Sequence, residues 1–315
     1  MINKVRVFLK EYNIENKSVV IAFSAGPDSC AISRLLNDLK EEFNLKITLA
    51  YFNHMWRKEA LEEEKFCREF AKKINADYII GRAPLNTPQN EEIARELRYK
   101  FLYNAADKKS SDTVFLAHNK NDNIETLIYR VIKGTSVKGL CAIPANRDIF
   151  YRPLLSVEKD EILKYLSDIN QNYLIDNSNS DTKYKRNFIR QKIMPLFQEI
   201  NPNFINNIDN LIKTSIASSK ILEDAIQEQI AKITLNNVIN RNLYLELGRE
   251  YRYEILNSYL GDKLKYRDYK TIRKLDDFVV KNPHSKTSLN KYEFLRTRKG
   301  KIFIEKSKEQ ENEWT

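Results

Sequence analysis

Residues 18–29 read SVVIAFSAGPDS, and this stretch predicts the fold of the first half of the chain. An apolar, β-branched run from Ser18 to Phe23 ends in a small polar turn, Ser24 to Ser29. An amphipathic segment, AISRLLNDLKEEF (31–43), follows the turn, so the order is strand, loop, helix. Because a helix N-terminus presents unpaired N–H groups and a partial positive charge, the loop is a candidate phosphate site.

The loop differs from the two commonest phosphate-binding patterns, since no lysine follows Gly26 and no GxGxxG is present. It resembles the SGGxDS loop of the PP-loop ATP pyrophosphatases, which cleave ATP to AMP and pyrophosphate. Ala25 stands at the first glycine of that loop, so we expect a backbone conformation there that is open to residues with a Cβ. Pro27 fits the first turn of a helix. The alternative is an ordinary strand-to-helix turn capped by Ser24 or Asp28.

Composition bounds the class of protein. The 315 residues suit two domains, and the formal net charge of +10 favours an anionic partner such as nucleic acid, although a basic proteome would give the same excess. The three cysteines, Cys30, Cys67 and Cys141, form no CxxC pair, as in a protein of the reducing cytoplasm. No stretch approaches the roughly 20 apolar residues of a membrane helix, so we expect a cytoplasmic protein with no membrane partner.

Strand-like and helix-like segments alternate through the first half of the chain. Strands are predicted at 18–23, 46–54, 77–82 and 112–118, and helices at about 30–43, 58–74, 90–108 and 122–133. This alternation predicts an α/β fold with a parallel sheet and helices on both faces, similar to a Rossmann fold. Ligands of such sheets bind beyond the carboxyl ends of the strands, where SAGPDS (24–29), NHMWR (53–57) and HNKND (118–122) lie.

The second half is less regular. A basic amphipathic helix is predicted at about 183–197 and a long helix at 203–233. LYLEL (243–247) and KIFIEK (301–306) are predicted to be strands, and EILNSYLGDKL (254–264) a helix. We therefore expect an N-terminal domain over 1–200, a helical connector over 201–235, and a small mixed α/β domain over 236–315.

Carboxylates follow the fourth predicted strand. Asp122 and Glu125 are three residues apart and share a helical face, and His118 precedes them. Near a phosphate loop these groups suit Mg²⁺, which takes oxygen ligands and bridges phosphates. The alternatives are that Asp122 or Asn121 only caps the helix, that Glu125 is solvated, and that His118 is a core histidine.

Basic groups lie in three further segments. Asn53, His54 and Arg57 follow the second strand, where Arg57 could bind a phosphate or carboxylate through two hydrogen bonds, or be a plain surface arginine. From residue 182 to 198 there are five Lys or Arg and no Asp or Glu. A basic face with interleaved aromatics suits RNA backbone or nucleotide phosphates. The arginine pairs that share a helical face are Arg95 with Arg98 and Arg186 with Arg190.

Taken together, the motifs resemble the tRNA(Ile)-lysidine synthetase family from about residue 18 to 197. The matching segments, in order, are SAGPDS (24–29), NHMWR (53–57), ARELRY (94–99), HNKNDNIET (118–126), KGTSVKGL (133–140), RPLL (152–155), DNSN (176–179), YKRNFIR (184–190) and Pro195. The chain departs from the family at Asn121, which replaces the first of two aspartates, and at Trp56, which replaces a leucine. The length resembles the short form of the family, with one C-terminal domain.

The resemblance implies a two-step ligation that uses ATP. The O2 of the wobble cytidine of tRNA(Ile) with anticodon CAU is adenylated and pyrophosphate leaves. The ε-amine of L-lysine then attacks C2 and AMP leaves, which forms lysidine and changes the codon specificity from methionine to isoleucine. On this basis residues 1–200 would be the catalytic domain and 236–315 the tRNA-binding domain.

The resemblance also implies roles for single residues. Asp28 positions metal or nucleotide, Arg186 or Arg190 neutralises phosphate, and Asp122 acts as substrate base or metal ligand. The residues expected to bind ATP are Ser24, Ala25, Gly26, Pro27, Asp28 and Ser29. The residues expected to contact substrate are Asn53, His54, Arg57, Arg95, Arg98, His118, Glu125 and Asn187. The candidate Mg²⁺ ligands are Asp28 and Asp122.

Other functions remain open on the sequence. Residues 263–301 hold 13 Lys or Arg against four Asp or Glu, which suggests a contact with the tRNA body or a generic basic surface. A PP-loop tRNA cytidine thiolase would share the loop, but it is expected to use paired cysteines and an iron–sulfur cluster. A non-catalytic RNA-binding protein with a degenerate loop would account for Ala25 and Asn121. A homodimer is left open.

Overall fold

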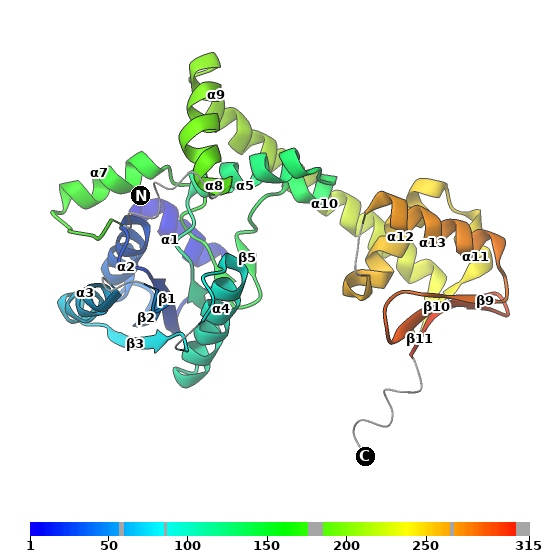
Figure 1. Ribbon diagram of the computed structural model, residues 1–315, viewed down its shortest axis with the longest axis horizontal. Helices are drawn as coiled ribbons and strands as arrows, with labels where there is room; N and C mark the ends of the chain where they lie inside the picture. The colour runs from blue at the N-terminus through cyan, green and yellow to red at the C-terminus, as the bar shows by residue number, and fades with distance from the viewer. Residues whose placement is uncertain (57–59, 85–86, 176–184, 265–267, 307–315) are drawn as a thin grey trace. The chain divides into compact units, whose positions relative to one another are not determined.

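The computed structural model describes residues 1–56, 60–84, 87–175, 185–264 and 268–306 (Figure 1). The chain divides into two compact units, Met1–Ile216 and Ala217–Thr315. The division falls inside the long helix α10 (Phe204–Ile233), within the predicted connector, and the three domain limits stay a prediction. Within the described ranges, no helix has the length and apolar character needed to cross a membrane.

The first unit contains a six-stranded sheet in the order β3-β2-β1-β4-β6-β5. Its strands are β1 (Ser18–Phe23), β2 (Lys46–Asn53), β3 (Asp77–Arg82), β4 (Val114–Phe115), β5 (Asn146–Arg147) and β6 (Phe150–Tyr151). Every pairing is parallel except that of β5 with β6, which confirms the predicted α/β fold. β1 lies between β2 and β4, so the direction of strand order reverses beside it, and that reversal is where such sheets bind ligands.

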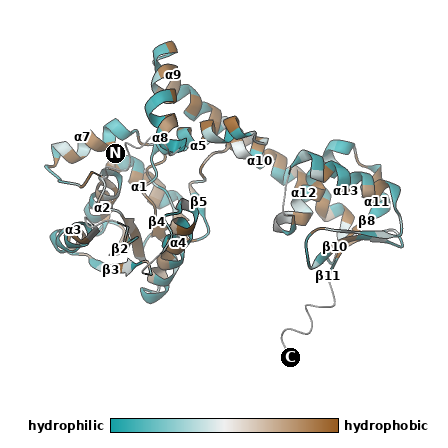
Figure 2. Ribbon diagram, in the orientation of Figure 1, coloured by the Kyte–Doolittle hydropathy of each residue, from teal (hydrophilic) through white to brown (hydrophobic). Residues whose placement is uncertain are grey.

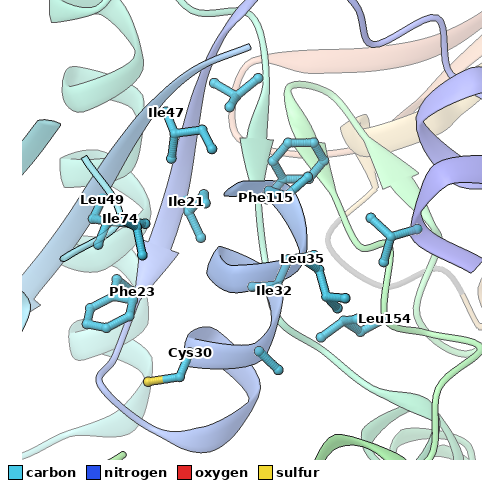
Figure 3. Close-up of a cluster of buried hydrophobic side chains, with 14 of the residues drawn as sticks. Ile21, Phe23, Cys30, Ile32, Leu35, Ile47, Leu49, Ile74, Phe115 and Leu154 are labelled. Atoms are coloured by element: carbon cyan, nitrogen blue, oxygen red, sulfur yellow. The ribbon is translucent and has the colours of Figure 1, made fainter. Parts of the chain in front are cut away.

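Helices cover both faces of this sheet. Because alternate side chains of β1 point to opposite faces, they pack in two separate clusters. Val19, Ile21 and Phe23 pack in one cluster with residues of α1, α2, α3 and α7. Figure 3 shows part of this cluster, including Ile21 and Phe23 of β1 and Ile32 of α2. Val20 packs in another cluster with Leu102 and other residues of α4. The helices are α1 (Ile2–Glu11), α2 (Pro27–Leu39), α3 (Ala60–Lys73), α4 (Glu91–Lys108), α5 (Lys120–Lys133), α6 (Val137–Leu140) and α7 (Lys159–Asp168). Most of them carry hydrophobic and hydrophilic residues on different faces (Figure 2).

The basic segment predicted as a helix over about 183–197 is continuously helical over residues 185–200, with a π-helical turn inside it. It consists of α8 (Lys185–Phe188), a π-helical turn (Ile189–Ile193) and α9 (Met194–Ile200). Ile189 and Met194 pack in one cluster with Ile124 and Leu127 of α5. This packing fixes the arginines of the segment beside the start of α5.

The second unit contains a five-stranded antiparallel sheet in the order β7-β8-β11-β10-β9, with its own apolar core. Its elements are β7 (Thr234–Leu235), β8 (Val238–Asn240), α11 (Arg241–Glu246), α12 (Arg249–Leu260), α13 (Tyr269–Lys281), β9 (Ser285–Ser288), β10 (Glu293–Arg298) and β11 (Lys301–Lys306). The prediction of a strand for 243–247 is wrong, because α11 covers most of it. The Asn240 side chain accepts hydrogen bonds from the backbone N–H groups of Asn242 and Leu243, which starts a helix there.

Candidate functional site

The loop from Ser24 to Gly26 joins β1 to α2, and Pro27 is the first residue of the helix, as predicted. The Ser29 hydroxyl organises the turn: it donates to the Gly26 carbonyl at 2.9 Å and accepts from the Ser24 backbone N–H at 3.2 Å. The Ser24 and Ser29 hydroxyl oxygens are 3.3 Å apart. Two hydroxyls and the start of α2 therefore lie together at the carboxyl end of β1.

Ala25 contradicts the expected backbone conformation. Its φ is +60°, in the left-handed region that favours glycine, and its side chain is fully buried. The carbonyl of Ala25 accepts a hydrogen bond from the Leu174 backbone N–H at 2.9 Å. The loop keeps its conformation with an alanine because the surrounding chain holds it.

Asp28, in the first turn of α2, lies at the centre of a polar network. The Lys159 ammonium group donates to both of its carboxylate oxygens, at 2.7 and 2.8 Å, and the Asn119 amide nitrogen donates to one of them at 3.2 Å. Burial raises the pKa of Asp28 above its usual value, although the Lys159 ammonium group acts in the opposite direction. Asp28 is thus a half-buried carboxylate that is paired with the Lys159 ammonium group.

The beginning of α5 meets this network. Asn119 is the N-cap of α5, and its side-chain oxygen accepts from the Asp122 backbone N–H at 3.0 Å. The Asp122 side chain in turn accepts a hydrogen bond from the Asn119 backbone N–H at 3.1 Å, and the two bonds together form a capping box. Asn121 accepts from the Lys159 backbone N–H at 3.0 Å and so ties α5 to the first residue of α7. The N-termini of α2, α5 and α7 therefore converge beside Asp28.

Arginines of the basic segment dock on the same end of α5. Arg190 donates to both oxygens of Glu125, at 2.7 and 2.9 Å, and to Asp122 at 2.9 Å. Arg186 donates to the Thr126 hydroxyl at 2.9 Å. Burial raises the pKa of Glu125 despite the arginine, because only 2% of its side chain is exposed. The shared faces predicted for Asp122 with Glu125 and for Arg186 with Arg190 are present, since both pairs meet here.

His118, just beyond β4, lies in positive surroundings. Burial, followed by the charges of four arginines, lowers the pKa of His118 to about 3. Its Nδ1 is buried and has no hydrogen-bond partner among the described residues. The arginines are Arg152, Arg186, Arg98 and Arg95. At neutral pH His118 is therefore an uncharged imidazole beside several cations.

The described part of the NHMWR segment contacts β2 and α3, and the predicted substrate contacts of Asn53 and His54 stay predictions. Asn53 is buried, and its side chain donates to Glu64 at 2.8 Å and accepts from the Met55 backbone N–H at 2.7 Å. The His54 ring packs edge-on against Phe52 and tilted against Trp56. Arg57 lies outside the described residues, as do the DNSN motif and Tyr184.

The remaining predicted contacts lie around the same edge of the first unit. Arg95 and Arg98 are exposed on α4, with the Arg95 guanidinium over the Tyr99 ring at 5.3 Å. Asn187 is half-buried in α8, beside Arg186. The roles predicted for these residues in substrate binding stay predictions.

Asp28 and Asp122 fit the oxygen chemistry of Mg²⁺. Both are hydrogen-bonded to Asn119, and the negative charge of Asp122 adds to burial in raising the pKa of Asp28. Mg²⁺ is commonly held by one or two carboxylates with waters and substrate phosphates, so two carboxylates are sufficient. The described residues contain no group of three or more His, Cys, Asp or Glu side chains that could hold a metal alone.

Sequence reasoning missed three residues of the site. Lys159 contacts Asp28 across 131 positions of the chain, and no local pattern indicates such a pair. Asn119 could have been found, because an asparagine three residues before an aspartate at a helix start is a capping signal. Arg152, known only as part of RPLL, is buried, and its guanidinium donates to the Pro144 carbonyl at 2.9 Å.

Comparison with known proteins identifies the first unit. A family model described as a PP-loop domain matches residues 1–197. The chain belongs to the PP-loop family. Among solved structures, a tRNA thiolase from Methanococcus maripaludis with a 4Fe–4S cluster has a TM-score of 0.56. The match is 17% identical and covers 67% of this chain and 77% of the thiolase chain. At this low identity it supports the fold alone.

Several curated relatives carry the name tRNA(Ile)-lysidine synthase. The one from Thermosipho africanus is 35% identical over 288 residues, which are 85% of this chain and 66% of the relative. The one from Clostridium perfringens is 32% identical over 246 residues, 75% of this chain and 52% of the relative. The one from Petrotoga mobilis is 28% identical over 302 residues, 88% of this chain and 97% of the relative. The chain thus spans about half to two thirds of the length of the first relatives that it matches.

The cysteines of this PP-loop protein do not resemble a cluster-binding set. Cys30 and Cys67 are buried, and burial raises the pKa of each thiol to about 12. A metal-binding cysteine must be a thiolate, which such burial opposes. Cys141, half-buried after α6, has no neighbouring cysteine in the sequence.

Proposed function

We propose that this PP-loop protein joins L-lysine to C2 of the wobble cytidine of tRNA(Ile) with anticodon CAU, at the expense of ATP. The observation that carries the proposal is the convergence of the phosphate loop, Asp28 and the Asp122–Glu125–Arg190 group at one sheet edge. The common name of the curated relatives points to the same reaction.

The nucleotide binds at the carboxyl end of β1. The hydroxyls of Ser24 and Ser29 and the N–H groups at the start of α2 hold the phosphates of ATP. Gly26 has no side chain, so the space beside the Ser24 hydroxyl is open. A Cβ atom at this position would fill it, 3.5 Å from the hydroxyl oxygen. Asp28 and Asp122 would hold Mg²⁺, which supplies charge neutralisation at the departing pyrophosphate.

In the first step the cytidine O2 attacks the α-phosphorus of ATP and pyrophosphate leaves. Negative charge grows on the phosphoryl oxygens, and fixed cations stabilise it. Arg190 is held in position by Glu125 and Asp122, and Arg186 by the Thr126 hydroxyl, so both guanidinium groups are preorganised beside the site.

In the second step the lysine ε-amine attacks C2 and AMP departs with O2. The attacking amine must be neutral, so a nearby group must accept its proton. Asp122 is our candidate for the substrate base or its metal ligand, with Glu125 in support. One oxygen of Asp122 accepts from the Asn119 backbone N–H and the other from Arg190, so either role requires the Arg190–Asp122 hydrogen bond to break while Glu125 keeps Arg190 in place.

The target cytidine lies in a single-stranded anticodon, whose bases are read by their exposed edges and by stacking. Arg95, Arg98 and His118 lie around the same edge and are assigned to the anticodon. The basic surface of the second unit is assigned to the tRNA body. A cytoplasmic location completes the proposal.

One assay separates the three candidate functions. The protein is incubated with CAU tRNA(Ile), ATP and radiolabelled lysine, and both the tRNA label and the AMP produced are counted. Label in the tRNA with equal AMP supports ligation. AMP formation and sulfur incorporation with a sulfur donor, without lysine label, would indicate a thiolase. Intact ATP with bound tRNA would indicate a non-catalytic RNA-binding protein.

A further inference from the structure

Glu64 of α3 is a buried carboxylate that joins the ends of two strands. Only 2% of its side chain is exposed. It accepts a hydrogen bond from the Asn53 side-chain nitrogen at the end of β2, at 2.8 Å. Arg82, at the end of β3, donates to both of its oxygens, at 2.8 and 2.7 Å. Because β2 pairs in parallel with β1, this junction lies at the sheet edge that carries the phosphate loop.

The charge of Glu64 determines how the Asn53 amide is oriented. Hydrogen bonds from Arg82 lower the pKa of Glu64 below its usual value, so the group is a carboxylate at neutral pH. A carboxylate only accepts hydrogen bonds, so the Asn53 NH₂ group faces Glu64 and the amide oxygen faces away from it. That oxygen accepts from the Met55 backbone N–H at 2.7 Å.

The bond from Met55 closes an Asx turn, in which an asparagine side chain accepts from the N–H two residues further on. The φ of Met55 is +58°, in the left-handed region, which costs a residue with a Cβ about 1–2 kcal/mol. Within the turn the His54 ring lies 5.1 Å from the Trp56 ring and 4.9 Å from the Phe52 ring. The orientation of the Asn53 amide therefore bears on where His54 and Trp56 lie.

We propose that Glu64 is a positioning residue for substrate binding: its carboxylate orients the Asn53 amide, and the amide holds residues 54–56 in place. This inference rests on the proposed function and on the substrate contact predicted for His54. The alternative is that Glu64 only fastens α3 to β3 through Arg82. Positioning requires that residue 53 keep an oxygen for the Met55 N–H, whereas pairing with Arg82 has no such requirement.

This difference can be tested by reversing the donor and acceptor of the pair. Asn53→Asp places a second carboxylate against Glu64, so the donor is lost and the two charges repel. The added change Glu64→Gln supplies an NH₂ group to the new carboxylate, whose other oxygen still accepts from Met55. The double variant restores the turn although the partner of Arg82 loses its charge, so a role through Arg82 alone predicts no rescue.

Trp56 reports the position of the turn directly. The chain has two tryptophans, Trp56 and Trp314, so every variant carries Trp314→Phe and the emission comes from Trp56 alone. Emission and its quenching by acrylamide are recorded on the full chain. Affinities for ATP and for CAU tRNA(Ile) are measured by binding, and kcat for lysidine formation is measured at saturation. The matched control is Arg68→Met, which removes the longest contact of Glu64, at 3.5 Å, and leaves Asn53 untouched.

For Asn53→Asp we expect Trp56 emission at longer wavelength, stronger quenching, and an affinity for at least one substrate that is weaker by about tenfold, with kcat changed less. The double variant should return most of the way to the parent in emission and affinity. Glu64→Gln alone leaves two amides that can pair in either orientation, so it should lie between the parent and Asn53→Asp. Arg68→Met should match the parent.

A double variant no closer to the parent than Asn53→Asp would overturn the inference, and so would parent-like emission in Asn53→Asp. Restored emission without any change of affinity across the series would overturn the role in substrate binding. If Asn53→Asp does not fold, Glu64→Gln and the double variant decide, because only the double variant keeps an acceptor-only group at position 53 and should lie nearer the parent. A parent that transfers no lysine would refute the proposed reaction, and emission and affinity would still decide the role of Glu64.

Discussion

At the scale of single residues, Ala25 is the position where side chain and backbone conflict. Its φ of +60° suits glycine, but its methyl group is buried. Ala25→Gly relieves strain and loses buried methyl area and chain stiffness, so we expect the free energy of unfolding to change by less than about 1 kcal/mol. Ala25→Val places a β-branched residue at the same φ and should lose roughly 2 kcal/mol or more. Urea unfolding of both variants checks this, and a fully stable Ala25→Val would contradict the conformation described for the loop.

The second residue-scale prediction concerns His118 and pH. The unfolded chain binds a proton at this histidine near pH 6.5, whereas burial and nearby arginines lower its folded pKa to about 3. The unfolded state therefore holds more protons between these values, and the folded state loses stability as the pH falls below 6.5. At about 1.4 kcal/mol per pH unit, the loss from this group is roughly 2 kcal/mol by pH 5.

The variant His118→Gln should remove this contribution, so its urea stability should fall less than that of the parent between pH 7 and 5. His284→Gln, which removes an exposed histidine from the second unit, serves as the control and should follow the parent. Identical pH profiles for the parent and His118→Gln would show that His118 titrates normally.

At the scale of elements, the junction between α5 and the basic segment depends on the pairing of Arg190 with Glu125. Arg190→Met leaves a carboxylate with 2% exposure unpaired, so we expect a loss of about 1–3 kcal/mol in the free energy of unfolding. The double variant Arg190→Met with Glu125→Leu removes both charges and should recover much of that loss.

The control for this pair is Lys232→Met, which breaks the exposed ion pair with Glu228 and should leave stability unchanged. Unfolding midpoints of the four proteins are compared at one pH. If the double variant were less stable than Arg190→Met, the two side chains would contribute independently and the junction would rest on packing alone.

The same elements show what the sequence could and could not predict. Residues 18–23 and 77–82 have the predicted strand bounds because a short apolar, β-branched run is a local signal. LYLEL reads as a strand by composition, but the cap supplied by Asn240 and the fold around it make it helical. The Asp28–Lys159 contact depends on how three helix starts meet, which no pattern within one segment encodes.

At the scale of the whole molecule, the net charge of +10 attracts an anionic partner such as tRNA. In the second unit, Lys270, Arg273 and Lys274 are exposed on α13. Their joint replacement by glutamine should weaken tRNA binding and lower the slope of log affinity against log salt by roughly 2, since each lost phosphate contact removes about 0.7–0.9.

The matched control removes three charges from the same unit that already pair with carboxylates. Lys263 donates to Glu293, and Lys286 and Arg296 both lie beside Glu305. Their replacement by glutamine should change the salt slope less, because these cations are already compensated. The comparison is made by filter binding at several salt concentrations with CAU tRNA(Ile). Equal losses in the two triple variants would mean that tRNA responds to net charge, and the α13 surface would then lose its assignment as a specific contact.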